Sequence, residues 1–197
     1  MSKKPINDRF REIGQDFFYG ISRKKNYKKA FPYLLEAAIM GELHCQNLVA
    51  YCYCNGLGVK RDITQGLSWY RRAAKYNHEE ALFSLGIFYD KGEFVTANPK
   101  KAYSLYKKAA ELGHERAQCN LGVCYLDGHG IKKDLVKGIE CMRKAAQNGD
   151  AKAQYNLGMA YLNGEGVHTK IHCARIWLEK AAKQGHKKAS KALRRAR

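Results

Sequence analysis

The chain has 197 residues, 45% of them hydrophobic, and carries 36 Lys and Arg against 18 Asp and Glu, a net charge of +18. This apolar content is enough to bury a core, which excludes wholesale disorder. With 3 Pro against 18 Gly, the composition favours helices over a β-sandwich or a disordered linker, provided that the glycines recur at regular places.

The N-terminal segment carries early positive charge but has no apolar run of the length that a signal peptide needs. No other stretch approaches the roughly 18 apolar residues of a membrane-spanning helix. We therefore expect a cytoplasmic protein with no transmembrane segment. Export by a route without a cleaved N-terminal signal stays open.

Four sets of residues recur along the chain at intervals of 36 residues. One set consists of glycines: Gly20, Gly56, Gly92, Gly128 and Gly164. A second consists of alanine pairs that begin at Ala37, Ala73, Ala109, Ala145 and Ala181. An aromatic set and an aliphatic set keep the same interval. Such self-similarity indicates a repeat architecture.

Within one repeat, the spacing predicts a first helix, a glycine turn and a second helix. Ala153, Leu157 and Tyr161 lie at i, i+4 and i+8 and form one apolar stripe. Gly158 recurs inside this helix, where glycine costs about 1 kcal/mol relative to alanine, which indicates close helix packing. Gly164 then allows the positive φ of a tight turn.

The second helix carries a buried face of its own and ends at a residue that tolerates the left-handed conformation, such as Gly185. Asp62, Asn98 and Asp134 recur just before this helix, where a short acceptor side chain can cap the free backbone amides. Lys170 occupies that place in the fifth repeat, so we expect its cap to be weaker.

One hairpin cannot cover its own apolar face, so neighbouring hairpins must stack. The sequence therefore predicts an all-α fold, a right-handed α/α superhelical solenoid of five 36-residue helix-turn-helix repeats plus a C-terminal capping helix. We expect a single solenoid over 1–197. Its repeats cover about 9–42, 43–78, 79–114, 115–150 and 151–186, and its cap covers 187–197.

The pattern Ala-x-x-x-Leu-Gly-x-x-Tyr-x-x-Gly-x-Gly-Val, followed by Lys-Ala-Ala-x-x-Gly, resembles the Sel-one-like repeat (SLR), a relative of the tetratricopeptide repeat. Residues 153–167 and 180–185 match it position by position. The resemblance covers essentially the whole chain. It implies a scaffold for protein interactions, and no reaction follows from such a fold alone.

Three repeats depart from the pattern. Ser22 and Arg23 replace the second turn glycine and the valine in the first copy, as expected of a terminal repeat. Val49 and Ala50 replace Leu-Gly in the second copy, which predicts slightly wider helix packing. Phe94 replaces the second turn glycine in the third copy and leaves the conformation of that turn open.

If the array resembles tetratricopeptide arrays, first helices line a concave groove, and the stripe not used for packing is apolar. We predict that this groove binds a peptide, a helix or an acidic protein. The alternative is that neighbouring hairpins bury the stripe. Its members are Tyr51, Phe83, Ile87, Val123, Leu126, Tyr155, Met159 and Leu162.

The positive charge is concentrated at the two ends of the chain. A basic patch at the C-terminus consists of Lys187, Lys188, Lys191, Arg194, Arg195 and Arg197. Such a surface attracts anionic partners. We expect an acidic protein, and the alternative is a basic protein that binds nucleic acid or an anionic surface. A solvated face that aids solubility explains the same charge.

The seven cysteines are irregularly placed. Some members of the resembled family pair cysteines within each repeat, which would need cysteine positions that recur at the repeat interval. Cys52 and Cys124 share such a position, but Phe88 interrupts it. We therefore expect reduced thiols, several of them in small apolar core positions.

The sequence gives no support for a metal, a cofactor or catalysis. Cys52 and Cys54 lack the paired spacing of zinc ligands. Ser104 and Lys107 match the Ser-x-x-Lys of penicillin-binding enzymes, but the partner motifs of that chemistry are absent from the sequence. We expect no enzyme activity, and the oligomeric state stays open.

Overall fold

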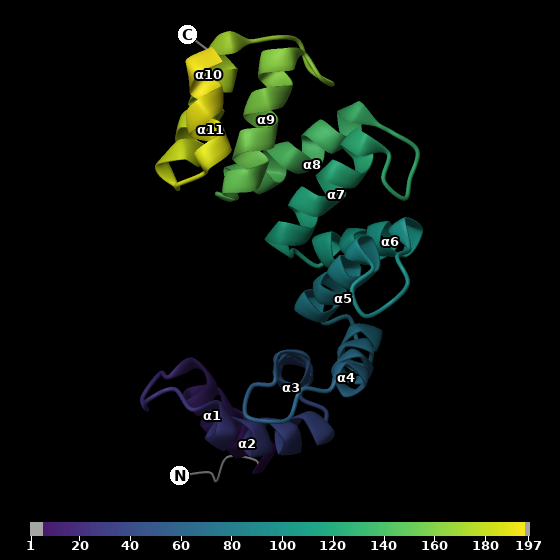
Figure 1. The fold of residues 1–197 in the computed structure, drawn as a ribbon, viewed down its shortest axis with the longest axis vertical. Helices are drawn as coiled ribbons and strands as arrows, with labels where there is room; N and C mark the ends of the chain where they lie inside the picture. Colours follow the sequence, from purple (N-terminus) through teal and green to yellow (C-terminus); the bar gives the residue numbers. More distant parts are fainter. Residues whose placement is uncertain (1–5, 196–197) are drawn as a thin grey trace. The chain divides into compact units, whose positions relative to one another are not determined.

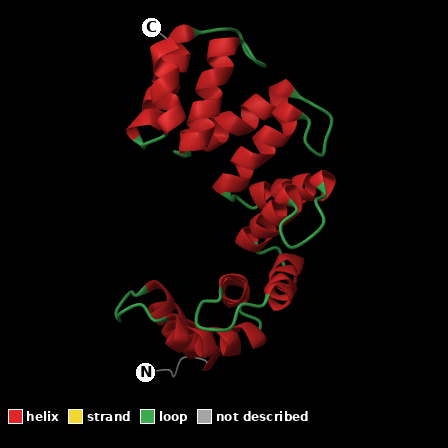
Figure 2. Ribbon diagram, viewed as in Figure 1, coloured by secondary structure: helices red, strands yellow, loops and turns green. Residues whose placement is uncertain are grey.

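The structure, a computed structural model, describes residues 6–195, and every regular element within this range is helical (Figures 1 and 2). The first five helices are α1 (Ile6–Tyr19), α2 (Tyr27–Ile39), α3 (Leu43–Asn55), α4 (Ile63–Lys75) and α5 (Glu79–Lys91). The others are α6 (Pro99–Glu111), α7 (Glu115–Asp127), α8 (Leu135–Gln147), α9 (Ala151–Asn163), α10 (Ile171–Lys183), α11 (Lys187–Ala192) and the short 3-10 helix η1 (Leu193–Arg195).

Consecutive helices pair as helix-turn-helix hairpins, from α1 with α2 to α9 with α10, and α11 follows the last hairpin (Figure 1). The predicted all-α solenoid of five repeats plus a C-terminal helix is confirmed. The chain divides into two compact units, Met1–Leu85 and Gly86–Arg197, and the division falls inside α5. The handedness of the superhelix and its continuity over the whole chain stay predictions.

Glycines shape the turn that joins the two helices of a hairpin. The first glycine of this turn adopts a positive φ, between 68° and 76°, in all five repeats. A Cβ atom on Gly58 would overlap the backbone carbonyl of Tyr27, and one on Gly130 would overlap that of Pro99. In each case the turn touches the start of the second helix of the preceding hairpin. In these two repeats the second turn glycine is therefore required both for its φ and for a close approach of two backbones.

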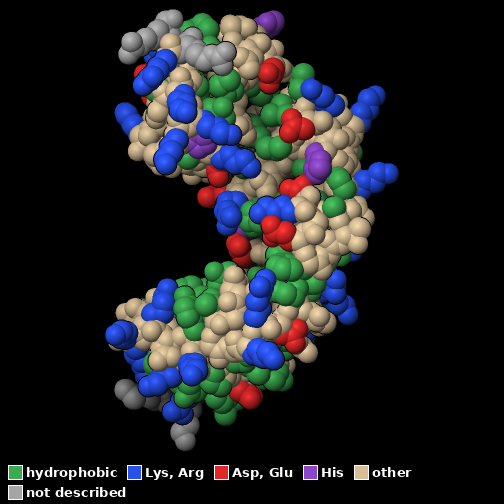
Figure 3. All heavy atoms as spheres, viewed as in Figure 1, with side chains coloured by type: hydrophobic (Ala, Val, Ile, Leu, Met, Phe, Trp, Pro, Cys, Tyr) green, Lys and Arg blue, Asp and Glu red, His purple; other side chains and the backbone are tan. Residues whose placement is uncertain are grey.

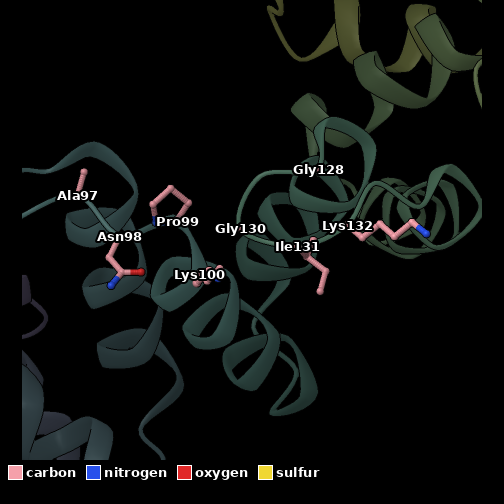
Figure 4. A pocket seen from close by; sticks show the side chains of 8 residues that line it. All are labelled: Ala97, Asn98, Pro99, Lys100, Gly128, Gly130, Ile131 and Lys132. Atoms are coloured by element: carbon pink, nitrogen blue, oxygen red, sulfur yellow. The ribbon is translucent and has the colours of Figure 1, made fainter.

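Figure 4 shows this arrangement around Gly130, with Pro99 at the start of α6 beside the turn that follows α7. The two segments border a surface pocket of about 670 Å³, also lined by Asn98, Lys100 and Lys132. The pocket marks the place where one hairpin docks on the previous one.

The two atypical turns keep their shape by different means. Phe94 adopts the left-handed conformation with φ of 63° and packs edge-on against Phe88, with ring centroids 5.4 Å apart. In the first copy, the carboxylate of Asp16 accepts hydrogen bonds from the backbone N–H and the hydroxyl of Ser22, both at 2.7 Å. These bonds lower the pKa of Asp16, with the backbone bond the larger cause.

The predicted caps of the second helices are confirmed. Asp62, Asn98 and Asp134 each accept a hydrogen bond at 3.0 Å from the backbone N–H three residues later. The N-cap Lys170 makes no side-chain cap bond. The bond from the Lys137 backbone N–H lowers the pKa of Asp134, because it stabilises the ionised carboxylate.

First helices begin with a different set of caps. Nδ1 of His114 accepts a hydrogen bond from the Ala117 N–H at 3.1 Å, and Nδ1 of His186 accepts one from the Ala189 N–H at 3.2 Å. A ring nitrogen can accept only when it carries no proton. Asp150 fills the same position in the fifth repeat.

The recurring glycine within the first helices lies against a large side chain of the second helix, as the sequence predicts. A Cβ on Gly122 would lie 2.9 Å from Cε of Met142, and a Cβ on Gly158 would lie 2.8 Å from Cγ of Leu178. Met142 and Leu178 are completely buried. The glycine thus allows a close helix crossing that buries a full-sized apolar side chain.

Substitution of Gly130 by Ala is expected to destabilise the fold by about 3 kcal/mol or more, because a positive φ and a backbone overlap both oppose the new methyl group. The control is Gly113→Ala, which has φ of 93° but nothing within 4 Å of the added Cβ. Its cost should be about 1 kcal/mol. Urea unfolding of the full chain measures both, and equal costs would contradict the backbone contact.

Substitution of Lys170 by Asp should stabilise α10 by about 1 kcal/mol, since it supplies the missing N-cap acceptor. The carboxylate should have a lowered pKa, as Asp134 does. A lowered pKa in the folded state contributes stability above the unfolded pKa of about 4 and loses it below the folded value. Thermal melts at pH 7 and pH 3 against Lys170→Ala test this, and a gain that persists in acid would refute it.

Candidate interaction surfaces

The predicted groove residues of the first unit do not form one exposed stripe. Tyr51 on α3 is 44% exposed, whereas Phe83 on α5 is 3% exposed. For Phe83 the burial alternative holds, so its prediction as a surface anchor is wrong. Helical spacing identifies a shared face of a helix but does not identify the neighbour that covers it.

The predicted groove residues of the second unit are half-buried, Ile87 on α5 among them. Val123 and Leu126 pack against a cluster that includes Ile139 and Met142 of α8. Leu126 also lies over Gly138, where an added Cβ would be 2.6 Å from Cδ2 of the leucine. These side chains are mainly part of the packing within their own hairpin.

The three groove residues of the fifth repeat pack toward the next helix. Tyr155, Met159 and Leu162 lie against a cluster that includes Leu178 of α10 and Ala189 of α11. The Tyr155 ring stacks on His186, with centroids 4.6 Å apart. Most of the predicted apolar groove is therefore used to join consecutive elements.

An exposed aromatic surface does exist on the first helices of the first unit, and we call Tyr19, His44 and Tyr51 the tyrosine face. Tyr19 of α1 is 46% exposed, and its hydroxyl lies 3.0 Å from Nε2 of His44 on α3. Tyr51 packs edge-on against Phe18, whose ring also contacts Tyr19. The face joins two repeats and presents two large aromatic side chains to solvent.

The ionisation of this face follows from partial burial. Burial raises the pKa of Tyr19, and nearby Cys45 and Glu80 add to the rise. Burial also lowers the pKa of His44 below its usual value, against the opposing effect of Glu80 and a neighbouring glutamate. At neutral pH the tyrosine is protonated and the imidazole uncharged, so the hydroxyl can donate to Nε2.

Tyr19 and His44 were not among the residues predicted from the sequence. In the first copy the repeat pattern is weakest, which hides the equivalence of Tyr19 with Asn55 and of Asp8 with His44. Residues 44, 51 and 55 lie at i, i+7 and i+11, the spacing of one helical face, and this signal could have identified them.

The described residues of the C-terminal basic patch lie on α11 and η1. Lys187, Lys188, Lys191 and Arg194 are exposed. Arg195 belongs to η1. Arg197 lies outside the described residues.

A second basic feature crosses three first helices of the second unit. Arg116 of α7, Lys152 of α9 and Lys188 of α11 occupy equivalent positions 36 residues apart, and we call them the basic row. All three are exposed. Nζ of Lys152 lies 3.5 Å from Oδ1 of Asn120 on α7, which places neighbouring first helices within reach of one another. In Figure 3, Lys and Arg side chains gather over the C-terminal helices.

All seven cysteines lie within residues 6–195 and are free thiols. Cys45, Cys52, Cys54, Cys119 and Cys124 are buried, which confirms the prediction that several fill small core positions. Burial raises the pKa of Cys45 and Cys52 to about 12. Among the described residues, no group of three or more His, Cys, Asp or Glu side chains could hold a metal ion.

No helix within the described range is both long and apolar enough to cross a membrane.

Ser104 and Lys107, the match to the Ser-x-x-Lys motif, are both exposed on α6, and Nζ of Lys107 lies 3.9 Å from Oε1 of Glu111. A lysine in this setting is a solvated surface residue.

The fold and the repeat geometry define an α-solenoid repeat protein. The model of the Sel1 repeat matches residues 13–42, 43–78, 79–114, 115–150 and 151–186. The chain belongs to the Sel1 repeat family, the family that its sequence resembles. Proteins of this family are generally scaffolds for protein interactions and are typically not catalytic. None of the curated proteins compared with the chain matches it.

Solved structures with the same fold include a Sel1 repeat protein from Oxalobacter formigenes, with 30% identity and a TM-score of 0.86 over 95% of this chain and 74% of that one. A protective antigen of uropathogenic Escherichia coli that displays an SLR fold has 28% identity and a TM-score of 0.87, over 95% of this chain and 40% of the antigen. Immunity protein Pa5087 from Pseudomonas aeruginosa, at 21% identity, 96% coverage of this chain, 70% of that one and a TM-score of 0.59, shares the fold alone.

In the native chain, the five buried cysteines should resist alkylation by iodoacetamide at pH 8, because both burial and a raised pKa suppress the reactive thiolate. Half-buried Cys173 and Cys141 should be labelled first, and all seven should react after unfolding in urea. Mass spectrometry of peptides measures the order. Fast native labelling of Cys52 or Cys119 would contradict the core placement.

Proposed function

We propose that this protein is a non-catalytic scaffold that binds a protein partner through the tyrosine face of its first unit. The observation that carries the proposal is the pairing of Tyr19 and Tyr51, each more than 40% exposed, on the first helices of two consecutive repeats. Family membership supports a scaffold, and the exposed aromatic residues supply a place for the contact.

The two tyrosines have the properties of binding hot spots. Each has a large apolar ring and a hydroxyl that can exchange hydrogen bonds with a partner. Both are held in place by contacts with the Phe18 ring, so little side-chain freedom remains to be lost when a partner binds. Burial of the exposed parts of both rings would then stabilise a complex.

The test is capture of proteins from native cell lysate by the immobilised full chain, quantified by mass spectrometry. A Tyr19→Ser/Tyr51→Ser variant should retain its partner at least about tenfold less well, since each hot-spot tyrosine contributes on the order of 1 to 2 kcal/mol. Both side chains are partly exposed, so the variant should stay folded with a modestly lower melting temperature, and capture is compared well below it.

The matched control is Tyr76→Ser. Tyr76 is 59% exposed but follows α4, in the loop before the next first helix. This variant should capture the same proteins as the unmodified chain. If the double variant and the unmodified chain capture the same proteins in equal amounts, the tyrosine face does not bind the partner.

A further inference from the structure

The basic row of the second unit suggests the chemistry of a ligand segment, an inference that rests on the proposed scaffold function. The equivalent residues in the earlier copies are Asp8, His44 and Glu80, so the charge of the side chain at this repeat position differs between the two halves of the chain. It is basic in Arg116, Lys152 and Lys188. Three cations at one repeat position on successive first helices form a regular line rather than a scattered surface charge.

The lysines of this row are not neutralised by the protein. Among residues 6–195, none forms an ion pair with Lys152, Lys188 or Lys191. Asp150, the nearest carboxylate in sequence to Lys152, is occupied as the N-cap of α9, at 2.6 Å from the Ala153 N–H. Exposed cations without a partner charge attract an anionic ligand.

The spacing of the row fits an extended polypeptide. Nζ of Lys152 on α9 lies 3.5 Å from Oδ1 of Asn120 on α7, so neighbouring first helices can contact one ligand. An extended chain advances about 3.3 Å per residue, so acidic residues repeated along such a chain can meet successive members of the row. Lys191, one turn beyond Lys188 on α11, extends the positive charge of this face.

The surroundings of the row favour a peptide over a nucleic acid. Tyr155, three residues after Lys152 on α9, is half-buried and stacked on His186. It does not provide the series of exposed rings on which bases stack.

We propose that the first-helix face of α7, α9 and α11 binds an extended acidic protein segment, whose repeated carboxylates pair with Lys152 and Lys188. Lys191 and Arg194 then form one end of this peptide site.

The test uses a fluorescein-labelled peptide, (Glu-Leu-Ser) repeated four times, and fluorescence anisotropy with the full chain at about 50 mM salt. The expected result is binding that weakens at least tenfold in Lys152→Gln/Lys188→Gln, and that weakens as salt rises because the pairs are exposed. A peptide with the same residues but its four glutamates adjacent should bind several-fold more weakly.

The control variant is Lys132→Gln/Lys133→Gln, which removes the same charge from exposed positions in the loop before α8. It should change the affinity less than threefold. An equal loss in both variants would show a diffuse charge effect and overturn the site. Absence of peptide binding at 1 mM would also overturn it, and so would tighter binding of a single-stranded RNA of equal charge that depends on the same two lysines.

The two proposals fail separately. Loss of capture in the Tyr19→Ser/Tyr51→Ser variant with no peptide binding would leave the scaffold function standing and reject the acidic segment. Peptide binding that depends on the basic row, with capture unaffected by the tyrosine substitutions, would support the peptide site and reject the tyrosine face.

Discussion

The close approach of backbones at glycine positions is the constraint on which the rest of this structure depends. Within a hairpin, Gly122 and Gly158 let the two helices cross near enough for a buried Met142 or Leu178 to fill the gap. Between hairpins, Gly58 and Gly130 let a turn rest on the carbonyl that begins an earlier helix. The remaining side chains pack within distances that these glycines set, which is why full-sized apolar residues can be buried in so small a repeat.

Much of this arrangement could be predicted from the sequence, because the physical reasons are local. The left-handed φ of the turn glycines, the caps at Asp62 and Asp134 and the missing cap at Lys170 all follow from properties of single residues. The groove could not be predicted in the same way. Tyr155 and Leu126 both belong to the predicted apolar stripe of the first helices. Tyr155 nevertheless packs toward the following helix, whereas Leu126 packs over Gly138 of its own hairpin. Periodicity defines a face, and only the three-dimensional packing decides which neighbour covers it.

The surfaces left for binding differ in chemistry between the two units. In the first, Tyr19 and Tyr51 present aromatic rings beside an uncharged His44. In the second, the equivalent helical faces carry Lys152 and Lys188, with apolar residues withdrawn into the packing. A repeat protein can vary these exposed positions freely, because the glycines and alanines that maintain the fold lie elsewhere in the repeat.

The contact between a turn glycine and the preceding hairpin also gives the array a direction of growth. The second, fourth and fifth repeats each carry a turn that docks backward, as Gly130 does on Pro99, onto the carbonyl at the start of the preceding second helix. A block of 36 residues that contains such a turn therefore brings both a turn that docks on the preceding hairpin and a helix start on which the following turn can dock. Duplication or deletion of such a block rejoins compatible ends, so the length of the array can change in whole repeats without a new interface having to evolve.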